Sequence, residues 1–145
     1  MPPHEAFPHG RSQVKQVVLV IASAADIVNA RQQGRAMAAL IGFTGSDLTV
    51  IATAISELAR NIVEYAGDGE IELAPVQKGQ RVGILIIARD EGPGILDVAK
   101  ALQDGYTTGK GLGIGLPGVR RLVDEFEIVS TLGTGTTVTV RKWLT

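Results

Sequence analysis

The sequence predicts a two-layer α+β fold, in which one mixed, mostly antiparallel β-sheet carries helices on a single face. Two observations lead to this prediction. The first half of the chain contains long segments whose apolar residues recur at helical spacing. The later segments read as strands joined in pairs by short glycine-containing loops, which is typical of antiparallel hairpins.

The composition predicts one folded domain over residues 13–145, preceded by a flexible tail at residues 1–12. Of 145 residues, 45% are hydrophobic and 20% charged, which suits a single compact core. The formal net charge is -1 and there is no run of Lys or Arg, so we expect neither a nucleic-acid nor a membrane partner. The absence of cysteine and of a long apolar stretch indicates a cytoplasmic protein.

The first strand and helix are predicted from a change in the spacing of apolar residues. Residues 13–21 are rich in β-branched side chains and read as a strand. Ser23 and Asp26 then have the spacing of a capping box, which predicts a helix from this point to about Ile41.

A second helix is predicted from Ser46 or Asp47 to Ala66, after Gly42 and Gly45 interrupt the chain. It has the strongest helical pattern in the sequence. Its apolar residues form one stripe, which consists of Leu48, Ile51, Ala52, Ile55, Leu58, Ala59 and Ile62.

Two hairpins complete the predicted sheet. Residues 70–76 alternate polar and apolar side chains, whereas residues 81–88 are almost wholly apolar and read as a central strand. A glycine-containing loop joins them. Residues 126–131 and 136–143 form a second pair around another glycine-rich turn.

The stretch from Gly92 to Gly118 contains the glycines and prolines that most strongly interrupt regular structure. Short helices are expected at residues 95–102 and 117–125. The segment GYTTGKG resembles a Walker loop, but it has three residues between its glycines and lacks the required Ser or Thr, so we reject that motif. The segment GIGLPG fits a dinucleotide-binding pattern, although no strand precedes it.

Two interpretations of this glycine-rich stretch stay open on the residues alone. It is either a flexible loop or an anion site at the start of a helix. In the second case the backbone amides of Gly111, Gly113 and Gly115, beside Lys110, would bind a polyphosphate.

Three polar residues elsewhere bear on the choice. Glu57 and Asn61 lie one turn apart on the second helix, opposite its apolar stripe, either as a solvated face or as a proton acceptor and a magnesium ligand. Arg60 has the spacing for an ion pair with Glu64. Asp90 ends an apolar strand, where its carboxylate needs a donor such as a turn amide or the exocyclic amine of adenine.

The ordered segments ELARN (57–61), DEGPGI (90–95), GLGIGL (111–116) and GTGTT (133–137) resemble the four motifs of the Bergerat-fold (GHKL) ATPases. This family includes gyrase, heat-shock chaperones, MutL and histidine kinases. The small size and the segment from Asp104 to Phe126 are more similar to the anti-sigma-factor serine/threonine kinases, in particular to the stressosome switch kinases of the RsbT type.

The resemblance implies a role for each matching residue. Glu57 would be the catalytic base and Asn61 the ligand of Mg²⁺, with ATP as the phosphate donor. Asp90 would contact the adenine amine, with Gly94 shaping that pocket and Thr137 assisting it. Gly111, Gly113 and Gly115 would wrap the phosphates, and Lys110 would add positive charge. Gly92, Ile114 and Leu116 complete the expected nucleotide-binding set.

The resemblance also implies partners. The acceptor would be a STAS-domain protein of the RsbS or RsbR type, and the released kinase would activate an RsbU-type serine phosphatase in a partner-switching stress response. The alternatives are an anti-sigma factor that sequesters a sigma factor and a nucleotide-binding regulator without turnover. A fragment of a histidine kinase remains formally open, although the lid segment favours the serine kinases.

Overall fold

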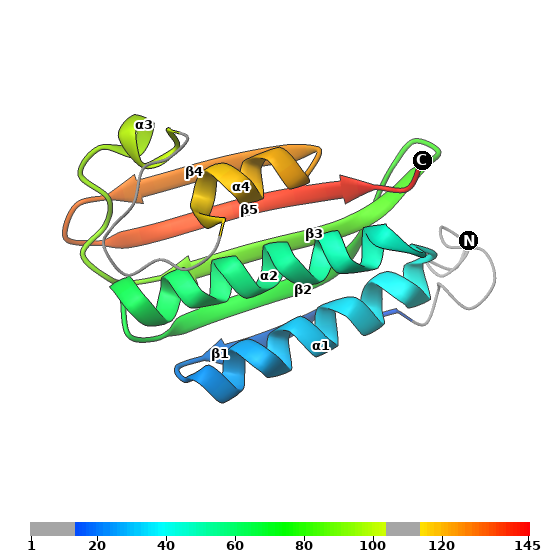
Figure 1. Cartoon of the computed structure of the whole chain (residues 1–145), viewed down its shortest axis with the longest axis horizontal. Helices are drawn as coiled ribbons and strands as arrows, with labels where there is room; N and C mark the ends of the chain where they lie inside the picture. Colours follow the sequence, from blue (N-terminus) through cyan, green and yellow to red (C-terminus); the bar gives the residue numbers. More distant parts are fainter. Residues whose placement is uncertain (1–13, 104–113) are drawn as a thin grey trace.

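The computed structural model describes residues 14–103 and 114–145. The tail predicted at residues 1–12 lies outside the described residues. The strands form one sheet in the order β1-β2-β3-β5-β4 (Figure 1). Their bounds are β1 Val17–Ile21, β2 Gly69–Lys78, β3 Arg81–Asp90, β4 Glu125–Thr131 and β5 Gly135–Trp143.

All pairings in this sheet are antiparallel, so the mixed pairing that we expected is absent from the described strands. The helices α1, α2 and α4 lie on one face of the sheet, with α4 beside α2 (Figure 1). This arrangement confirms the predicted two-layer α+β fold. The helices are α1 Ala24–Ile41, α2 Ser46–Tyr65, α3 Val98–Ala101 and α4 Gly115–Leu122.

The start of α1 follows the predicted cap. Ser23 Oγ accepts a hydrogen bond from the Asp26 amide at 3.2 Å, and Asp26 Oδ2 accepts one from the Ala22 amide at 2.8 Å. The first bond satisfies an amide that the first turn of a helix leaves without a partner, and the second fixes the residue before the N-cap. The helix ends where Gly42 adopts a φ of 129°, which a residue with a side chain rarely adopts.

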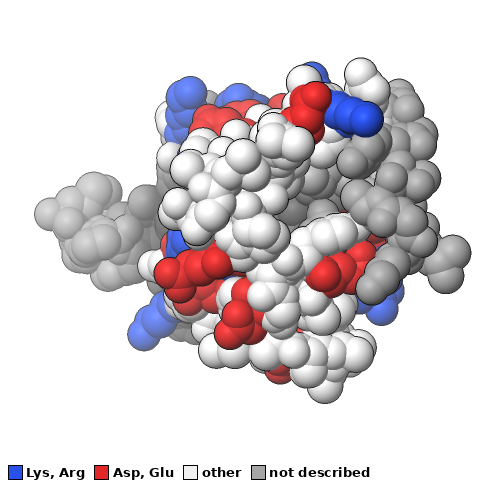
Figure 2. Space-filling model, turned by 90° about the vertical axis from the view of Figure 1, so that its left-hand side faces the viewer, with Lys and Arg blue, Asp and Glu red and all other residues white. Residues whose placement is uncertain are grey.

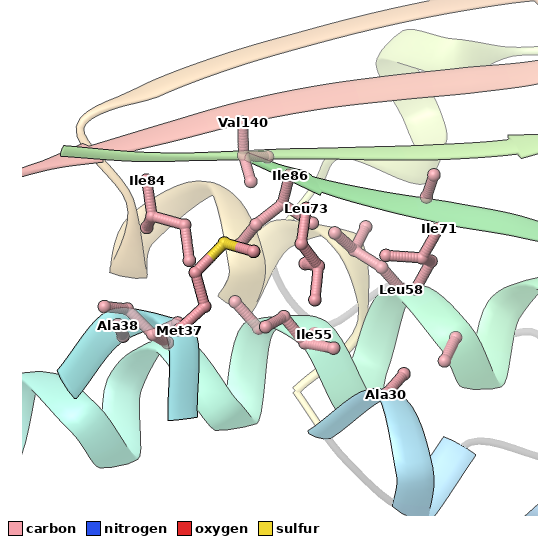
Figure 3. Close-up of a cluster of buried hydrophobic side chains, with 14 of the residues drawn as sticks. Ala30, Met37, Ala38, Ile55, Leu58, Ile71, Leu73, Ile84, Ile86 and Val140 are labelled. Carbon is pink, nitrogen blue, oxygen red and sulfur yellow. The ribbon is translucent and has the colours of Figure 1, made fainter. Parts of the chain in front are cut away.

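The hydrophobic core lies between the two long helices and the sheet (Figure 3). The helices approach closely at Gly34 of α1, where an added Cβ would lie 2.0 Å from Ile55 Cδ1. The glycine at position 34 therefore allows α2 to pack closely against α1. This packing compensates for the low helix propensity of glycine. The labelled core side chains are Ala30, Met37, Ala38, Ile55, Leu58, Ile71, Leu73, Ile84, Ile86 and Val140.

Several element boundaries differ from the predicted ones. The first strand begins at Val17 instead of residue 13, and α3 occupies a shorter stretch than 95–102. The helix predicted at residues 117–125 begins at Gly115 and ends at Leu122. Asp124 explains this end: its amide donates to Arg141 O at 3.0 Å and its Oδ2 accepts the Trp143 amide at 2.7 Å, which directs the chain into β4.

The face of the sheet opposite the helices is partly polar. Arg89 Nη2 contacts Glu72 Oε1 at 2.7 Å, and its Nε contacts Glu70 Oε1 at 3.0 Å. The hydrogen bond that Arg89 donates to Glu72, followed by the one that it donates to Glu70, raises the pKa of the Arg89 guanidinium. Within the described chain, no helix is both long and apolar enough to cross a bilayer.

Candidate functional site

A cavity of about 370 Å³ opens between the C-terminal half of α2, the end of β3, the loop that follows β3 and the start of α4. This volume lies within the range of small-molecule sites. The polar lining side chains come mainly from α2, whereas the far wall is made by apolar residues of β3 and β5 and by the loop. The lining comprises Glu57, Leu58, Arg60, Asn61, Ile62, Glu64, Tyr65, Ala88, Asp90, Pro93, Gly94, Ile95, Leu96, Ala101, Ile114, Gly115, Leu116, Pro117, Thr136 and Val138.

Asp90, at the end of β3, faces this cavity and begins a tight turn. Its Oδ1 accepts a hydrogen bond from the Gly92 amide at 2.9 Å, so the turn amide is one of its donors. The described residues supply no hydrogen bond to Oδ2. A carboxylate oxygen is therefore left to accept a hydrogen bond from a ligand that enters the cavity.

Gly92 and Gly94 allow the loop after β3 to pack closely. An added Cβ at Gly92 would lie 2.6 Å from Ala66 Cβ, which leaves no room for a side chain beside the end of α2. Gly94 has a φ of +80°, and a Cβ there would lie 2.5 Å from Thr131 O. Gly94 lines the cavity. Gly92 does not line it, but its amide holds the Asp90 carboxylate in place through a hydrogen bond.

The same loop is held to the turn between β4 and β5. The Gly133 amide donates to Pro93 O at 2.9 Å, and the Ile95 amide donates to Ser130 Oγ at 2.7 Å. The Ser130 and Thr136 hydroxyls are 2.7 Å apart and share a hydrogen bond. Backbone groups and two hydroxyl groups, separated widely in the sequence, thus fix this end of the cavity.

The structure places Thr136, and not Thr137, in the cavity wall. Thr136 pairs with Asp90 in the register of β3 and β5, whereas Thr137 pairs with Arg89 on the other face of the sheet. Successive side chains of a strand point to opposite faces, so Thr136 shares the face of Asp90 and Thr137 lies on the other face. The role predicted for Thr137 stays a prediction, and this register makes Thr136 the better placed of the two to assist Asp90.

Glu57 is buried, with 8% of its surface exposed, although it lies opposite the apolar stripe of α2. The start of α4 covers this side of α2, which the periodicity of α2 alone did not reveal. Glu57 Oε1 accepts a hydrogen bond from the Gly115 amide at 3.1 Å, and Oε2 accepts one from Arg60 Nη1 at 2.8 Å. Both donors of this carboxylate also line the cavity.

Gly115 is the first residue of α4 and has a φ of +64°. No side chain of the N-cap residue, Ile114, caps this helix. The positive end of the helix dipole and the Gly115 amide therefore point toward Glu57, which takes the place of a capping anion.

Of the other predicted site residues, Asn61, Ile114 and Leu116 line the cavity. Lys110, Gly111 and Gly113 lie outside the described residues. The spacing of Glu57 and Arg60, i and i+3 with opposite charges, was the signal for the ion pair that the prediction overlooked. For Thr136, the signal was the alternation of side chains between the two faces of β5, which places Thr136 and Val138 on one face and Thr137 on the other.

Charged side chains of both signs lie around the cavity. Figure 2 views the end of the molecule where the β4–β5 turn and the loop after β3 lie, and it shows separate groups of Asp and Glu together with Lys and Arg side chains. The charged side chains in the described lining are Glu57, Arg60, Glu64 and Asp90. Arg60 is the cation of this set, so a polyphosphate fits better beside Arg60 and the start of α4 than beside Asp90.

The donor set fits a magnesium ion that is held together with phosphate. Among the described residues, no group of three or more His, Cys, Asp or Glu side chains could hold a metal ion. Asn61 contributes a neutral amide oxygen to the cavity. Mg²⁺ is typically bound by one or two protein oxygens together with water and substrate phosphates, which matches this sparse set.

Comparisons with known proteins agree with this geometry. The family model described as "Histidine kinase-like ATPase domain" matches residues 20–142. The chain is 53% identical over 119 residues to "Serine/threonine-protein kinase RsbT" of Bacillus subtilis (strain 168), which covers 82% of this chain and 90% of that protein. It is 32% identical over 121 residues to "Anti-sigma F factor" of Thermoanaerobacter sp. (strain X514), with coverage of 79% and 83%.

A solved structure supports the fold alone. The structure of "Mycobacterial sensor histidine kinase MprB" matches with a TM-score of 0.51 at 14% identity, over 90% of this chain and 97% of that chain. The family model spans α1, α2, the cavity and nearly all of β5. The resemblance drawn from the four motifs is thereby confirmed, and the chain belongs to the histidine kinase-like ATPase family.

Proposed function

We propose that the protein is an ATP-dependent protein serine/threonine kinase whose acceptor is a STAS-domain protein. The observation that carries this proposal is the position of Glu57, a buried carboxylate at the wall of the nucleotide cavity and beside the start of α4. The relative at 53% identity, which is named a serine/threonine-protein kinase, supports the same reaction class.

ATP enters with adenine at the end of the cavity where Asp90 lies. The exocyclic amine of adenine donates a hydrogen bond to Asp90 Oδ2, while Oδ1 keeps its bond to the Gly92 amide. Ala88, Val138 and the loop residues supply apolar surface for the ring. The phosphates then extend toward Arg60 and the Gly115 amide, away from the Asp90 carboxylate.

The acceptor hydroxyl attacks the γ-phosphorus from the side of Glu57. A new bond forms between the hydroxyl oxygen and phosphorus, the bond from phosphorus to the β–γ bridging oxygen breaks, and ADP leaves. The Glu57 carboxylate takes the hydroxyl proton. Positioning and charge supply most of the acceleration in such reactions, so no covalent intermediate on the protein is required.

Asn61 would hold Mg²⁺ through its amide oxygen, with phosphate oxygens and water as the other ligands. When bound, the ion neutralises phosphate charge. Lys110, Gly111 and Gly113 are proposed to complete the phosphate site from the segment that precedes α4. Gly115 is the described member of this glycine group, and its amide already lines the cavity.

The partners are proposed from the family resemblance and the serine/threonine kinase relative. The acceptor would be a STAS protein of the RsbS or RsbR type, and a serine phosphatase of the RsbU type would be the second partner. The direct test is incubation of the protein with ATP, Mg²⁺ and a cognate STAS protein, followed by intact mass measurement. A gain of one phosphate on serine or threonine is expected, and phosphohistidine or an unmodified STAS protein would contradict the proposal.

A second candidate is an anti-sigma factor that binds a sigma factor in a nucleotide-dependent way. The relative at 32% identity that is named an anti-sigma F factor favours this candidate. Co-purification from the native organism distinguishes the two. A STAS protein or a phosphatase in the complex supports the kinase of the stress response, and a sigma factor in their place supports the alternative.

A further inference from the structure

Glu57 accepts two hydrogen bonds, one on each carboxylate oxygen, from groups that also line the cavity. Arg60 Nη1 lies 2.8 Å from Oε2, and the Gly115 amide nitrogen lies 3.1 Å from Oε1. Each carboxylate oxygen therefore has a donor in the structure. The ion pair is formed within one helix, at i and i+3, and the Glu57 side chain is only 10% exposed.

The two donors are also the described donor groups best suited to a terminal phosphate. Arg60 and Gly115 both line the cavity, and Asn61 follows Arg60 directly in α2. A guanidinium recognises phosphate and carboxylate oxygens with the same planar set of N–H groups. The Gly115 amide carries the positive end of the α4 dipole, which also favours either anion.

Glu57 and the terminal phosphate of ATP thus compete for the same donors. We propose that Arg60 is a positioning residue that exchanges partners, with the Glu57 carboxylate in the nucleotide-free protein and the γ-phosphate in the ATP complex. The exchange rests on the proposed kinase function. It releases Glu57 toward an acceptor hydroxyl only when the phosphate to be transferred is present.

The exchange predicts that Arg60 distinguishes ATP from ADP. ADP has no γ-phosphate, so Arg60 remains on Glu57 in the ADP complex. The loss of Arg60 should therefore weaken ATP binding and leave ADP binding nearly unchanged. The loss of the Glu57 charge should have the opposite effect on ATP, because Arg60 no longer has to leave a charged partner.

The test is a double-mutant cycle on the full chain with Mg²⁺ and fluorescent analogues of ATP and ADP. We expect Arg60→Met to weaken ATP binding about tenfold and ADP binding less than about twofold, and Glu57→Gln to strengthen ATP binding about threefold. In the double variant the gain from Glu57→Gln should disappear. Arg60→Lys keeps a charge without the planar fork and should recover part of the discrimination between ATP and ADP.

Arg35→Met is the matched control, since Arg35 is exposed on α1 and does not line the cavity. It should leave both affinities unchanged. Equal effects of Arg60→Met on ATP and ADP, or a gain from Glu57→Gln that persists without Arg60, would overturn the exchange. Thermal unfolding of each variant identifies a folding defect. If Arg60→Met is unfolded, the ratio of ATP to ADP affinity of Arg60→Lys decides whether the exchange occurs.

The binding measurements contain no acceptor protein. A wild-type protein that transfers no phosphate to a STAS protein would refute the proposed function. The ratio of ATP to ADP affinity would still test whether Arg60 exchanges partners. With an acceptor that is phosphorylated, Arg60→Lys should raise the KM for ATP more than it lowers kcat. A purely structural role for Arg60 would lower stability without this separation.

Discussion

The two ends of the cavity are built in different ways. At the Asp90 end, backbone amides of Gly92, Ile95 and Gly133 hold the loop after β3, and two of these bonds tie it to the β4–β5 turn. At the α4 end, the described contacts are an ion pair and a helix amide that converge on one carboxylate, Glu57. One end is fixed by the fold, and the other by groups that a ligand can displace.

This difference matches the work that the proposed function assigns to each end. Recognition of a base requires a shape that exists before the ligand arrives, because ordering a loop on binding lowers affinity. Phosphoryl transfer requires charges that rearrange around the reacting phosphate. Substitutions at the Asp90 end should therefore change nucleotide affinity and stability, whereas substitutions at the α4 end should change the rate or the preference for ATP over ADP.

Glu57→Gln gives the largest effect expected at the α4 end. The substitution keeps the size of the side chain and removes the proposed proton acceptor, so phosphoryl transfer to the proposed STAS acceptor should fall about 100- to 10,000-fold. ATP binding should strengthen about threefold, as the exchange of Arg60 between partners predicts. Initial rates from intact mass, together with nucleotide titrations, measure the two quantities.

Glu64→Gln is the control for this variant, because Glu64 also lines the cavity. It should change the transfer rate less than about threefold if position, and not mere charge, sets the role of Glu57. A rate loss of the same size in both variants would remove the distinction between Glu57 and other carboxylates of the cavity.

Gly135→Ala should break the fixed end of the cavity. Gly135 has a φ of +141°, and an added Cβ would lie 2.1 Å from Asp90 O, so the start of β5 must move away from the end of β3. We expect a loss of about 3 kcal/mol in the free energy of unfolding. Urea denaturation measures this loss, and nucleotide titration should show weaker binding of both ATP and ADP.

Gly133→Ala in the same turn is the matched variant. Gly133 also has a positive φ, +79°, but an added Cβ would meet nothing within 4 Å. Only the backbone strain remains, which costs about 1–2 kcal/mol. If the two alanine variants lose equal stability, close packing against Asp90 is not what fixes this end.

The parts of the fold that the sequence predicted well have local causes. The start of α1 depends on Ser23 and Asp26, which are neighbours in the chain, and the stripe of α2 is set by helical spacing alone. The end of α4 depends on Asp124 and β5, which are separated in the sequence, so the prediction ran past it.

The site shows the same division. The cavity contains Glu57, Asn61, Asp90 and Gly94, which the motifs had singled out. The burial of Glu57 depends on where α4 packs, and the choice between Thr136 and Thr137 depends on the register of β3 with β5. Both depend on tertiary structure, which the spacing of residues along one helix or strand does not predict.

Asp90→Asn tests whether the fixed end of the cavity binds the base, and it should cost less stability than Gly135→Ala. The amide oxygen of Asn can still accept the Gly92 hydrogen bond, so stability should change by less than about 1 kcal/mol. Its amide nitrogen is then a donor at the position where adenine also donates. Affinity for ATP and ADP should fall together by about 10- to 100-fold, as measured by nucleotide titration. A loss confined to ATP would contradict the assignment of this end to the base.

Ser130→Ala should have the smallest effect and tests how the loop after β3 is held. The hydroxyl accepts the Ile95 amide at 2.7 Å and shares a hydrogen bond with the Thr136 hydroxyl, so its removal should cost about 1 kcal/mol of unfolding free energy. Nucleotide affinity should weaken by less than about fivefold, because the Gly133 bond to Pro93 remains. Thr134→Ala, in the exposed turn that follows β4, should change stability by less than about 0.5 kcal/mol. If Ser130→Ala loses no more unfolding free energy than Thr134→Ala, main-chain hydrogen bonds alone hold the loop. The difference between the two ends of the cavity would then be one between main-chain groups at the Asp90 end and side-chain charges at the α4 end.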